Sequence, residues 1–144
     1  MKQYLFILIP VILIISGMNS CQKGDFEIIE TFNLEDHIGR YEFDIDLETF
    51  RDGVKNVSTH HSVGYVTKEN DYTIKVLFDY SEPNINCVYE FLVRSDGSFY
   101  STYKGAGDRS GQFIDGNIEF QEKIELGNGN FKHLKFIGVN FSKL

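Results

Sequence analysis

The chain has 144 residues, of which 42% are hydrophobic and 15% aromatic, and its formal net charge is −7 at pH 7. An acidic chain is poorly suited to bind nucleic acid or anionic lipid head groups by charge alone. Its length allows one compact domain after a short leader, and not two.

The first twenty residues have the composition of an export signal. Lys2 supplies a positive charge, and Tyr4 to Ile15 follows as an uncharged run interrupted by Pro10. A membrane-spanning helix needs about 20 apolar residues, so this run is too short to be one. Its length does fit the roughly 7–15 residues of the apolar part of a signal peptide.

The leader ends in Met18-Asn19-Ser20-Cys21, which resembles a bacterial lipobox. In such lipoproteins the leader is cut before the cysteine, and acyl chains such as palmitate are attached to the cysteine. The resemblance implies a signal peptide over residues 1–20, lipid attachment at Cys21, and a lipidated tether over residues 21–32. Two or three acyl chains, at about 0.8 kcal/mol per buried methylene, would hold the protein on a membrane.

Gln22 follows the cysteine, and by the sorting rule of Gram-negative lipoproteins this residue resembles a signal for the outer membrane. The alternatives for the leader are a secretory signal with an incidental cysteine and an uncleaved membrane anchor. Once Cys21 is acylated, Cys87 has no cysteine partner for a disulfide. Stability must then come from an apolar core, which is well supplied: the chain has 21 Phe and Tyr residues, and all but Tyr4 and Phe6 follow the leader.

Residues 33–144 predict a single all-β domain, beginning with one helical turn. Asn33 is a suitable N-cap for a turn that Gly39 would end. The next segment alternates without a break between apolar and acidic residues. Its apolar members are Tyr41, Phe43, Ile45 and Leu47. A period of two predicts a strand with one buried face and one solvated face.

Seven more strands are expected, at about 54–67, 72–80, 85–94, 99–103, 111–114, 118–126 and 131–141. Turn signals separate them, among them Asp52-Gly53, Asp96-Gly97 and a Gly/Asn hairpin at 127–130. None of the intervening segments is long enough for a crossover helix. The sequence therefore predicts an antiparallel meander of about eight strands that closes into an up-and-down barrel, which leaves no exposed edges.

The last predicted strand does not keep one pattern. Leu134 and Phe136 share one parity, whereas Val139 and Phe141 share the other. A bulge at Gly138 would bring all four side chains to the inner face, and we predict that bulge.

The order of these elements resembles a known family. The segment GQFIDGNIEF at residues 111–120, followed by a Gly/Asn hairpin and a final strand, is similar to the ending of small lipocalin-like lipoproteins of Bacteroidetes. Gly39-Arg40-Tyr41 resembles the Gly-x-aromatic opening of lipocalin-type barrels, although Trp is absent. The resemblance implies a small anchored barrel and transfers no functional residue beyond Cys21.

Polar residues on faces that otherwise look buried give a candidate pocket. The face of the second strand that carries Val57, Val63 and Tyr65 also carries His61, and the seventh strand places Glu122 among apolar residues. A carboxylate inside a barrel is costly unless it is paired or solvated. We therefore predict a pocket at one barrel mouth with His61, Glu122, Tyr65 and Tyr89. The alternative is that His61 and Glu122 lie in solvent at the rim.

Other chemistry is weakly supported. His60 and His61 are adjacent, so they point to opposite faces of a strand and cannot easily bind one metal ion. Cys87 falls on an apolar face and is expected to be a packed small hydrophobe. We expect neither a metal nor a cofactor and, without a convincing nucleophile and base, no enzyme activity.

The expected function is a non-catalytic interaction or accessory module at the cell envelope, whose partner would be a protein or a glycan. The alternative is a lipocalin-like binder of a small apolar or amphipathic ligand in the barrel interior. Eight strands enclose an interior that side chains alone can fill, so the two possibilities differ in whether the interior is hollow.

Overall fold

The computed structural model describes residues 32–79, 85–101, 103 and 107–141. These residues belong to the second of two units into which the chain divides, Met1–Glu30 and Thr31–Leu144. The predicted signal peptide and Cys21 lie outside the described residues, as does nearly all of the predicted tether. In the part of the chain described, no helix is long and apolar enough to cross a membrane.

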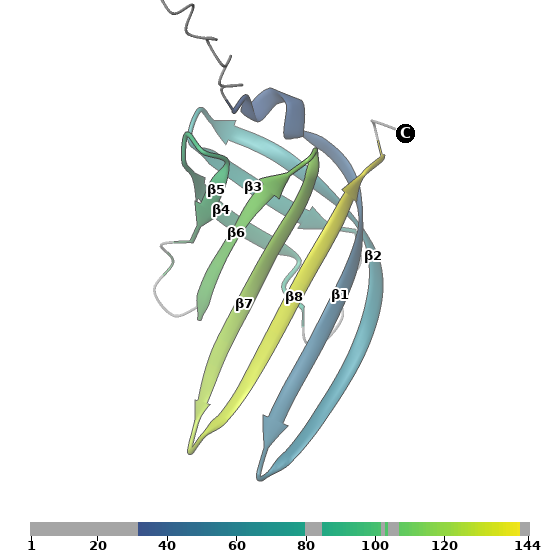
Figure 1. Cartoon of the computed structure of the whole chain (residues 1–144), viewed down its shortest axis with the longest axis vertical. Helices are drawn as coiled ribbons and strands as arrows, with labels where there is room; N and C mark the ends of the chain where they lie inside the picture. Colours follow the sequence, from purple (N-terminus) through teal and green to yellow (C-terminus); the bar gives the residue numbers. More distant parts are fainter. Residues whose placement is uncertain (1–31, 80–84, 102, 104–106, 142–144) are drawn as a thin grey trace, which may run out of the picture. The chain divides into compact units, whose positions relative to one another are not determined.

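The second unit is a closed antiparallel barrel in which every strand pairs with the next and β8 pairs with β1 (Figure 1). This confirms the predicted eight-stranded meander. A 3-10 helix, η1 (Leu34–His37), precedes the barrel, and Asn33 caps it as predicted. The strands are β1 (Gly39–Arg51), β2 (Val54–Asn70), β3 (Thr73–Phe78), β4 (Val88–Val93), β5 (Ser98–Tyr100), β6 (Asp108–Ile114), β7 (Asn117–Gly127) and β8 (Asn130–Asn140).

Three of the hairpins turn on an Asp-Gly or Asn-Gly pair with both residues at positive φ. Asp52-Gly53 and Asp115-Gly116 each have φ values of 50° and 81°, and Asn128-Gly129 has values of 51° and 77°. These are the angles of type I′ turns, whose twist matches that of the flanking strands. The predicted hairpins at 52–53 and 127–130 are therefore confirmed.

The predicted alternation in β1 is also confirmed, because its four apolar residues from Tyr41 to Leu47 are all buried. They face an interior dominated by aromatic rings. Phe120 and Phe136 lie parallel with their ring centroids 4.1 Å apart, and Phe43 meets Phe78 edge-on at 4.9 Å. The buried aromatic residues are Tyr41, Phe43, Phe78, Tyr89, Phe91, Phe99, Phe120 and Phe136. Their side chains fill the barrel.

The predicted bulge at Gly138 is wrong. β8 pairs with β1 in one continuous register, with Phe43 opposite Gly138, and Val139 and Phe141 point outward, each 45% exposed. Its register with β1 turns Gly138 inward, where Phe43 leaves no room for a side chain. A Cβ on Gly138 would lie 2.5 Å from the Phe43 ring, and one on Gly64 of β2 would lie 2.8 Å from it.

The inner face of β2 also differs from the prediction. Because Tyr41 pairs with Gly64, the even-numbered residues of β2 share the inner face with the apolar residues of β1. Val57 and Tyr65, predicted to be inside, are therefore 63% and 38% exposed. The inner face of β2 contributes Gly64 and Val66 to the core, and below them it is polar.

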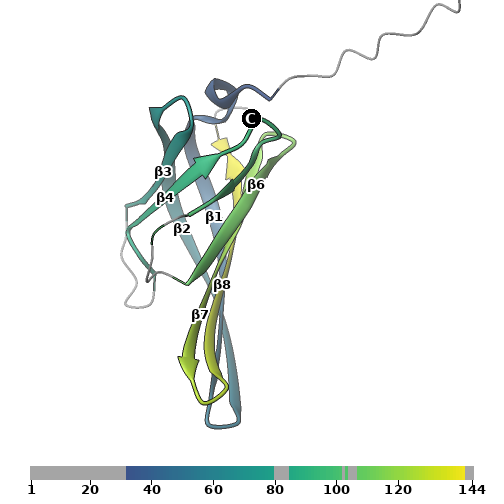
Figure 2. The same ribbon diagram turned by 90° about the vertical axis from the view of Figure 1, so that its left-hand side faces the viewer.

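Two long hairpins, β1–β2 and β7–β8, extend past the short strands of the barrel (Figure 2). β3 pairs with β2 only from Gly64 to Asn70, and β6 pairs with β7 only from Asn117 to Lys123. β1 and β8 stay paired as far as Phe50 and Phe131. The extension is therefore a four-stranded sheet in the order β7-β8-β1-β2.

Candidate functional site

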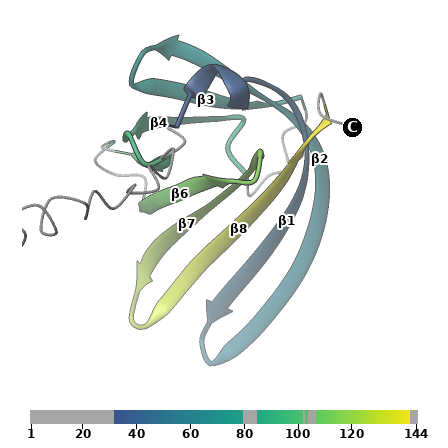
Figure 3. The ribbon, with the colours of Figure 1, turned by 45° about the horizontal axis from the view of Figure 1, so that its top comes forward.

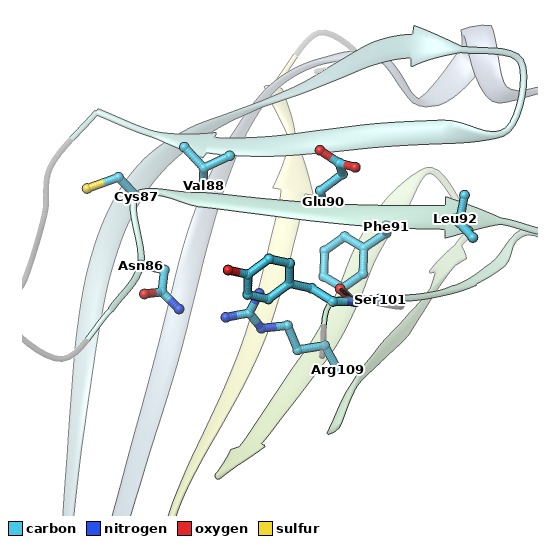
Figure 4. A pocket seen from close by; sticks show the side chains of 9 residues that line it. Asn86, Cys87, Val88, Glu90, Phe91, Leu92, Ser101 and Arg109 are labelled. Atoms are coloured by element: carbon cyan, nitrogen blue, oxygen red, sulfur yellow. Dashed lines mark hydrogen bonds between the residues drawn. The ribbon is translucent and has the colours of Figure 1, made fainter. Parts of the chain in front are cut away.

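The barrel wall has an opening between β4 and β6. β5 lies between these strands, but it has three residues and pairs with β4 only at Leu92 and Val93. The first half of β4 therefore has no described strand on that side. A cavity of about 670 Å³ occupies the opening (Figure 4). It is lined by Asn86, Cys87, Val88, Glu90, Phe91, Leu92, Ser101, Tyr103 and Arg109.

Backbone groups of β4 face this opening. The Cys87 carbonyl accepts from the Phe78 amide at 2.9 Å, and the Val93 amide donates to the Tyr72 carbonyl at 2.8 Å. Odd-numbered residues of β4 thus bond to β3, and the amides and carbonyls of Val88 and Glu90 point the other way. Within the described part of the chain, the opening therefore offers a short unpaired strand edge.

The floor of the site is an ion pair between neighbouring strands. Glu122 of β7 pairs directly with Arg109 of β6, and its side chain is 1% exposed. Glu122 Oε1 accepts from Arg109 Nη2 at 2.6 Å and from Nε at 2.9 Å. The two opposite charges allow a carboxylate to be buried in an aromatic core, where an unpaired one would be very costly.

Tyr89 and Asn86 also contact this carboxylate. The Tyr89 hydroxyl donates to Glu122 Oε2 at 3.2 Å, and Asn86 Nδ2 lies 3.5 Å from Oε1. The Arg109 guanidinium stacks on the Tyr89 ring at 4.8 Å from the centroid. Burial, and next the charge of Glu122, raise the pKa of Tyr89 well above its ordinary value, so the phenol stays a donor.

The arrangement suits hydrogen bonding to a ligand better than acid–base chemistry. Both oxygens of Glu122 are engaged, whereas Nη1 of Arg109 has no hydrogen-bond partner among the described contacts. Figure 4 shows Asn86 and Arg109 on one side of β4 and Val88 and Glu90 on the other. A bound group would thus meet donors on the inner side and a carboxylate on the outer side of the same opening.

The structure brings together two of the four predicted pocket residues. Glu122 and Tyr89 are in contact, as described, but His61 and Tyr65 lie on the outer face of β2. His61 Nδ1 bonds there to Asp44 Oδ1 of β1. The prediction for these two residues is wrong because the register with β1 turns the even-numbered residues of β2 inward, and Gly64 has no side chain to mark that face in the sequence.

Sequence reasoning missed Arg109 and Asn86. The predicted strand begins only at about residue 111, but β6 begins at Asp108, so Arg109 becomes the cross-strand neighbour of Glu122. The signal for this contact was an arginine within pairing distance of a buried carboxylate across a two-residue turn. Cys87, predicted to be packed, is exposed at the rim of the opening. β4 starts only at Val88, so the apolar alternation does not reach it.

The side chains around the histidines bear on the question of a metal site. Among the residues that the structure describes, no group of three or more His, Cys, Asp or Glu side chains is placed to hold a metal ion. His133 Nε2 lies 3.2 Å from Gln121 Oε1 on the outer face, and His60 Nε2 lies 3.0 Å from Ser58 Oγ.

Comparison with known proteins gave no match, whether with family models, with curated protein sequences or with solved structures.

Proposed function

We propose that this protein is a lipoprotein of the cell envelope, anchored through acylated Cys21 to the outer membrane of a Gram-negative bacterium. Its barrel would act there as a non-catalytic interaction module. The lipobox-like leader supports the anchor. The resemblance to small lipocalin-like lipoproteins supports the same placement.

The filled barrel interior is the observation that carries the choice of an interaction module. Eight buried aromatic side chains occupy the space that a small apolar ligand would need. Ligand pockets of about 300–1,000 Å³ are the usual size, and a cavity of about 670 Å³ lies in the barrel wall. This arrangement favours recognition at the surface over a ligand held in the interior.

The wall opening is the surface best suited to that recognition. The amides and carbonyls of Val88 and Glu90, which no described strand pairs with, can pair with an extended backbone, as in β-augmentation. The Nη1 group of Arg109 can donate to a carbonyl or carboxylate of the same partner. We therefore infer that an extended segment of a partner protein binds at β4.

Native mass spectrometry of the detergent-purified protein separates this proposal from the alternative. We expect the mass of the polypeptide with its acyl chains and no further molecule. Recovery of a retained small apolar molecule, with aromatic residues of the core protected from labelling when it is present, would favour the lipocalin-like alternative.

A photo-crosslinker placed in the intact protein on cells tests the position of the contact. Val88, at the opening, is 48% exposed, and Val139, on the outer face of β8, is 45% exposed. We expect a discrete crosslinked protein from position 88 and none from the matched position 139. Equal crosslinking at both positions, or none at 88, would contradict binding at the opening.

A further inference from the structure

The free edge of β2 is a second surface, separate from the opening beside β4. β3 pairs with β2 only from Gly64 onward, so residues 54–63 have β1 on one side and no described strand on the other. Figure 3 shows β2 as the outer strand of the long β1–β2 hairpin. An unpaired strand edge of this length is a template for another strand.

The backbone groups that face outward can be identified from one hydrogen bond. The Asp79 amide donates to the Val63 carbonyl at 3.2 Å. The backbone amides and carbonyls of the odd-numbered residues of β2 therefore point away from β1. Lys55, Val57, Thr59 and His61 therefore present their amides and carbonyls on the open side. At about 3.3 Å per residue these groups span roughly 20 Å.

This edge lacks the features that usually prevent pairing. Residues 54–63 contain no proline and one lysine, Lys55, whose Nζ is held by Glu48 at 2.8 Å. The register with β1 runs unbroken from Gly39 to Arg51, so no bulge twists the strand away. Natural edge strands normally carry such devices.

We propose that a second copy of this chain pairs with this edge, β2 against β2 in antiparallel orientation, about a two-fold axis at Thr59. Facing residues in such a ladder must both present their backbone groups to the open side. Of the registers that satisfy this, only an axis at Thr59 pairs the odd-numbered residues from 55 to 63 entirely with one another, clear of the turn and of the segment paired with β3. With the axis at Thr59, Val57 faces His61 and Lys55 faces Val63. Every open residue from 55 to 63 then has a partner.

Neighbouring registers are poorer. An axis at His61 would place two histidines opposite each other and would run into the segment that β3 already occupies. With the axis at Val57, the pairing would run past the turn at Asp52-Gly53, and Val63 would have no partner in β2. The Thr59 register also places two threonines opposite each other, which is a favourable cross-strand pair.

Charge supports the same register. The outer face of β1 carries an acidic row from Glu42 to Glu48. Val63 pairs with Glu42 across β1 and β2. In the Thr59 register, Lys55 of one copy lies across Val63 of the other and so approaches its Glu42. One strand, β2 of the other copy, then separates these two opposite charges, and no like charges face each other across the ladder.

Cysteine crosslinking in the full chain tests the register. In a Cys87→Ser background, Thr59→Cys should form a disulfide-linked dimer under mild oxidation, because facing Cα atoms lie about 5.5 Å apart, within disulfide range. Val57→Cys and His61→Cys should each remain monomeric alone, since four residues of offset separate the thiols by roughly 13 Å. Mixing these two variants should restore the dimer band.

Two outcomes would overturn the proposal. One is dimer formation by Thr59→Cys that is no faster than by Val57→Cys alone or by the background. The other is crosslinking of Thr59→Cys to a different protein in place of a second copy. Thr59→Pro removes only an outward amide, so it should keep its circular dichroism spectrum and lose dimer mass in ultracentrifugation. If this variant does not fold, the crosslinking pattern still decides.

Discussion

At the scale of single residues, Glu122 and Arg109 are the groups whose burial has the largest energetic consequence. Their side chains are 1% and 10% exposed, so neither charge can be fully solvated once the other is removed. Truncating one partner of a buried pair typically costs about 3–5 kcal/mol, whereas replacing both by apolar groups costs far less.

We therefore expect Glu122→Ala to lower the free energy of unfolding by about 3–5 kcal/mol. The double variant Glu122→Leu/Arg109→Met should lose much less, because no unpaired charge is left in the barrel. Urea denaturation of both variants and of Glu122→Gln measures this. Equal losses in the single and double variants would mean that the unpaired arginine is not the cause.

The buried phenol of Tyr41 should make the free energy of unfolding depend on pH in the alkaline range. Burial raises the pKa of Tyr41 to about 12, although a hydrogen bond from Asn140 partly opposes the shift. From its ordinary value of 10.0 to about pH 12, the unfolded chain loses this proton while the folded chain keeps it. Stability contributed by the neutral phenol is thus complete below pH 10 and is lost as the pH rises through this window.

The slope should be about 1.4 kcal/mol per pH unit for this one group. Tyr41→Phe removes the titrating group, so its free energy of unfolding should fall less steeply than that of the wild type above about pH 10. Denaturant titrations at a series of alkaline pH values compare the two slopes. Parallel slopes would show that Tyr41 does not titrate differently in the two states.

At the scale of elements, the hairpins depend on backbone conformation at their turns. Gly53 has a φ of 81°, and a Cβ added there would meet no atom within 4 Å. Gly53→Ala thus changes only the conformational preference, and should cost about 1–2 kcal/mol. Gly53→Asn, which tolerates positive φ, should cost less. Thermal unfolding of the two variants tests this, and an equal loss would point to a contact instead.

The elements also show what the sequence could predict. β1 was placed correctly because one parity is wholly apolar and the other mostly acidic. β2 and β8 were misread because the inward residues at the decisive positions, Gly64 and Gly138, have no side chain to mark a face. They are glycines because Phe43 lies between them. This reason is visible only once three strands are paired.

The candidate site, too, could be predicted from the sequence only in part. Glu122 and Tyr89 were found because parity alone puts a carboxylate and a tyrosine among apolar residues. Arg109 was not, because its strand begins next to a glycine-rich segment and has too short an alternation to detect. The wall opening depends on β5 having three residues, and a tertiary feature of this kind leaves no periodic pattern.

For the whole molecule, the proposed membrane anchor depends on a single side chain. Cys21 is the residue to which acyl chains would be attached when the leader is cleaved. Cys21→Ser should leave the barrel intact, because the eight strands of the barrel close on one another. We expect this variant to shift from the membrane fraction to the soluble fraction of the envelope.

Cys87→Ser is the matched control, since this thiol is exposed at the rim of the wall opening and its loss should not change fractionation. Mass spectrometry of the wild-type N-terminal peptide should show acyl chains on Cys21. Membrane retention of Cys21→Ser would contradict the lipid anchor and would favour an uncleaved leader, because a run of apolar residues would then be holding the protein. Release of the variant, with acylation absent, would tie the location of the barrel to this cysteine.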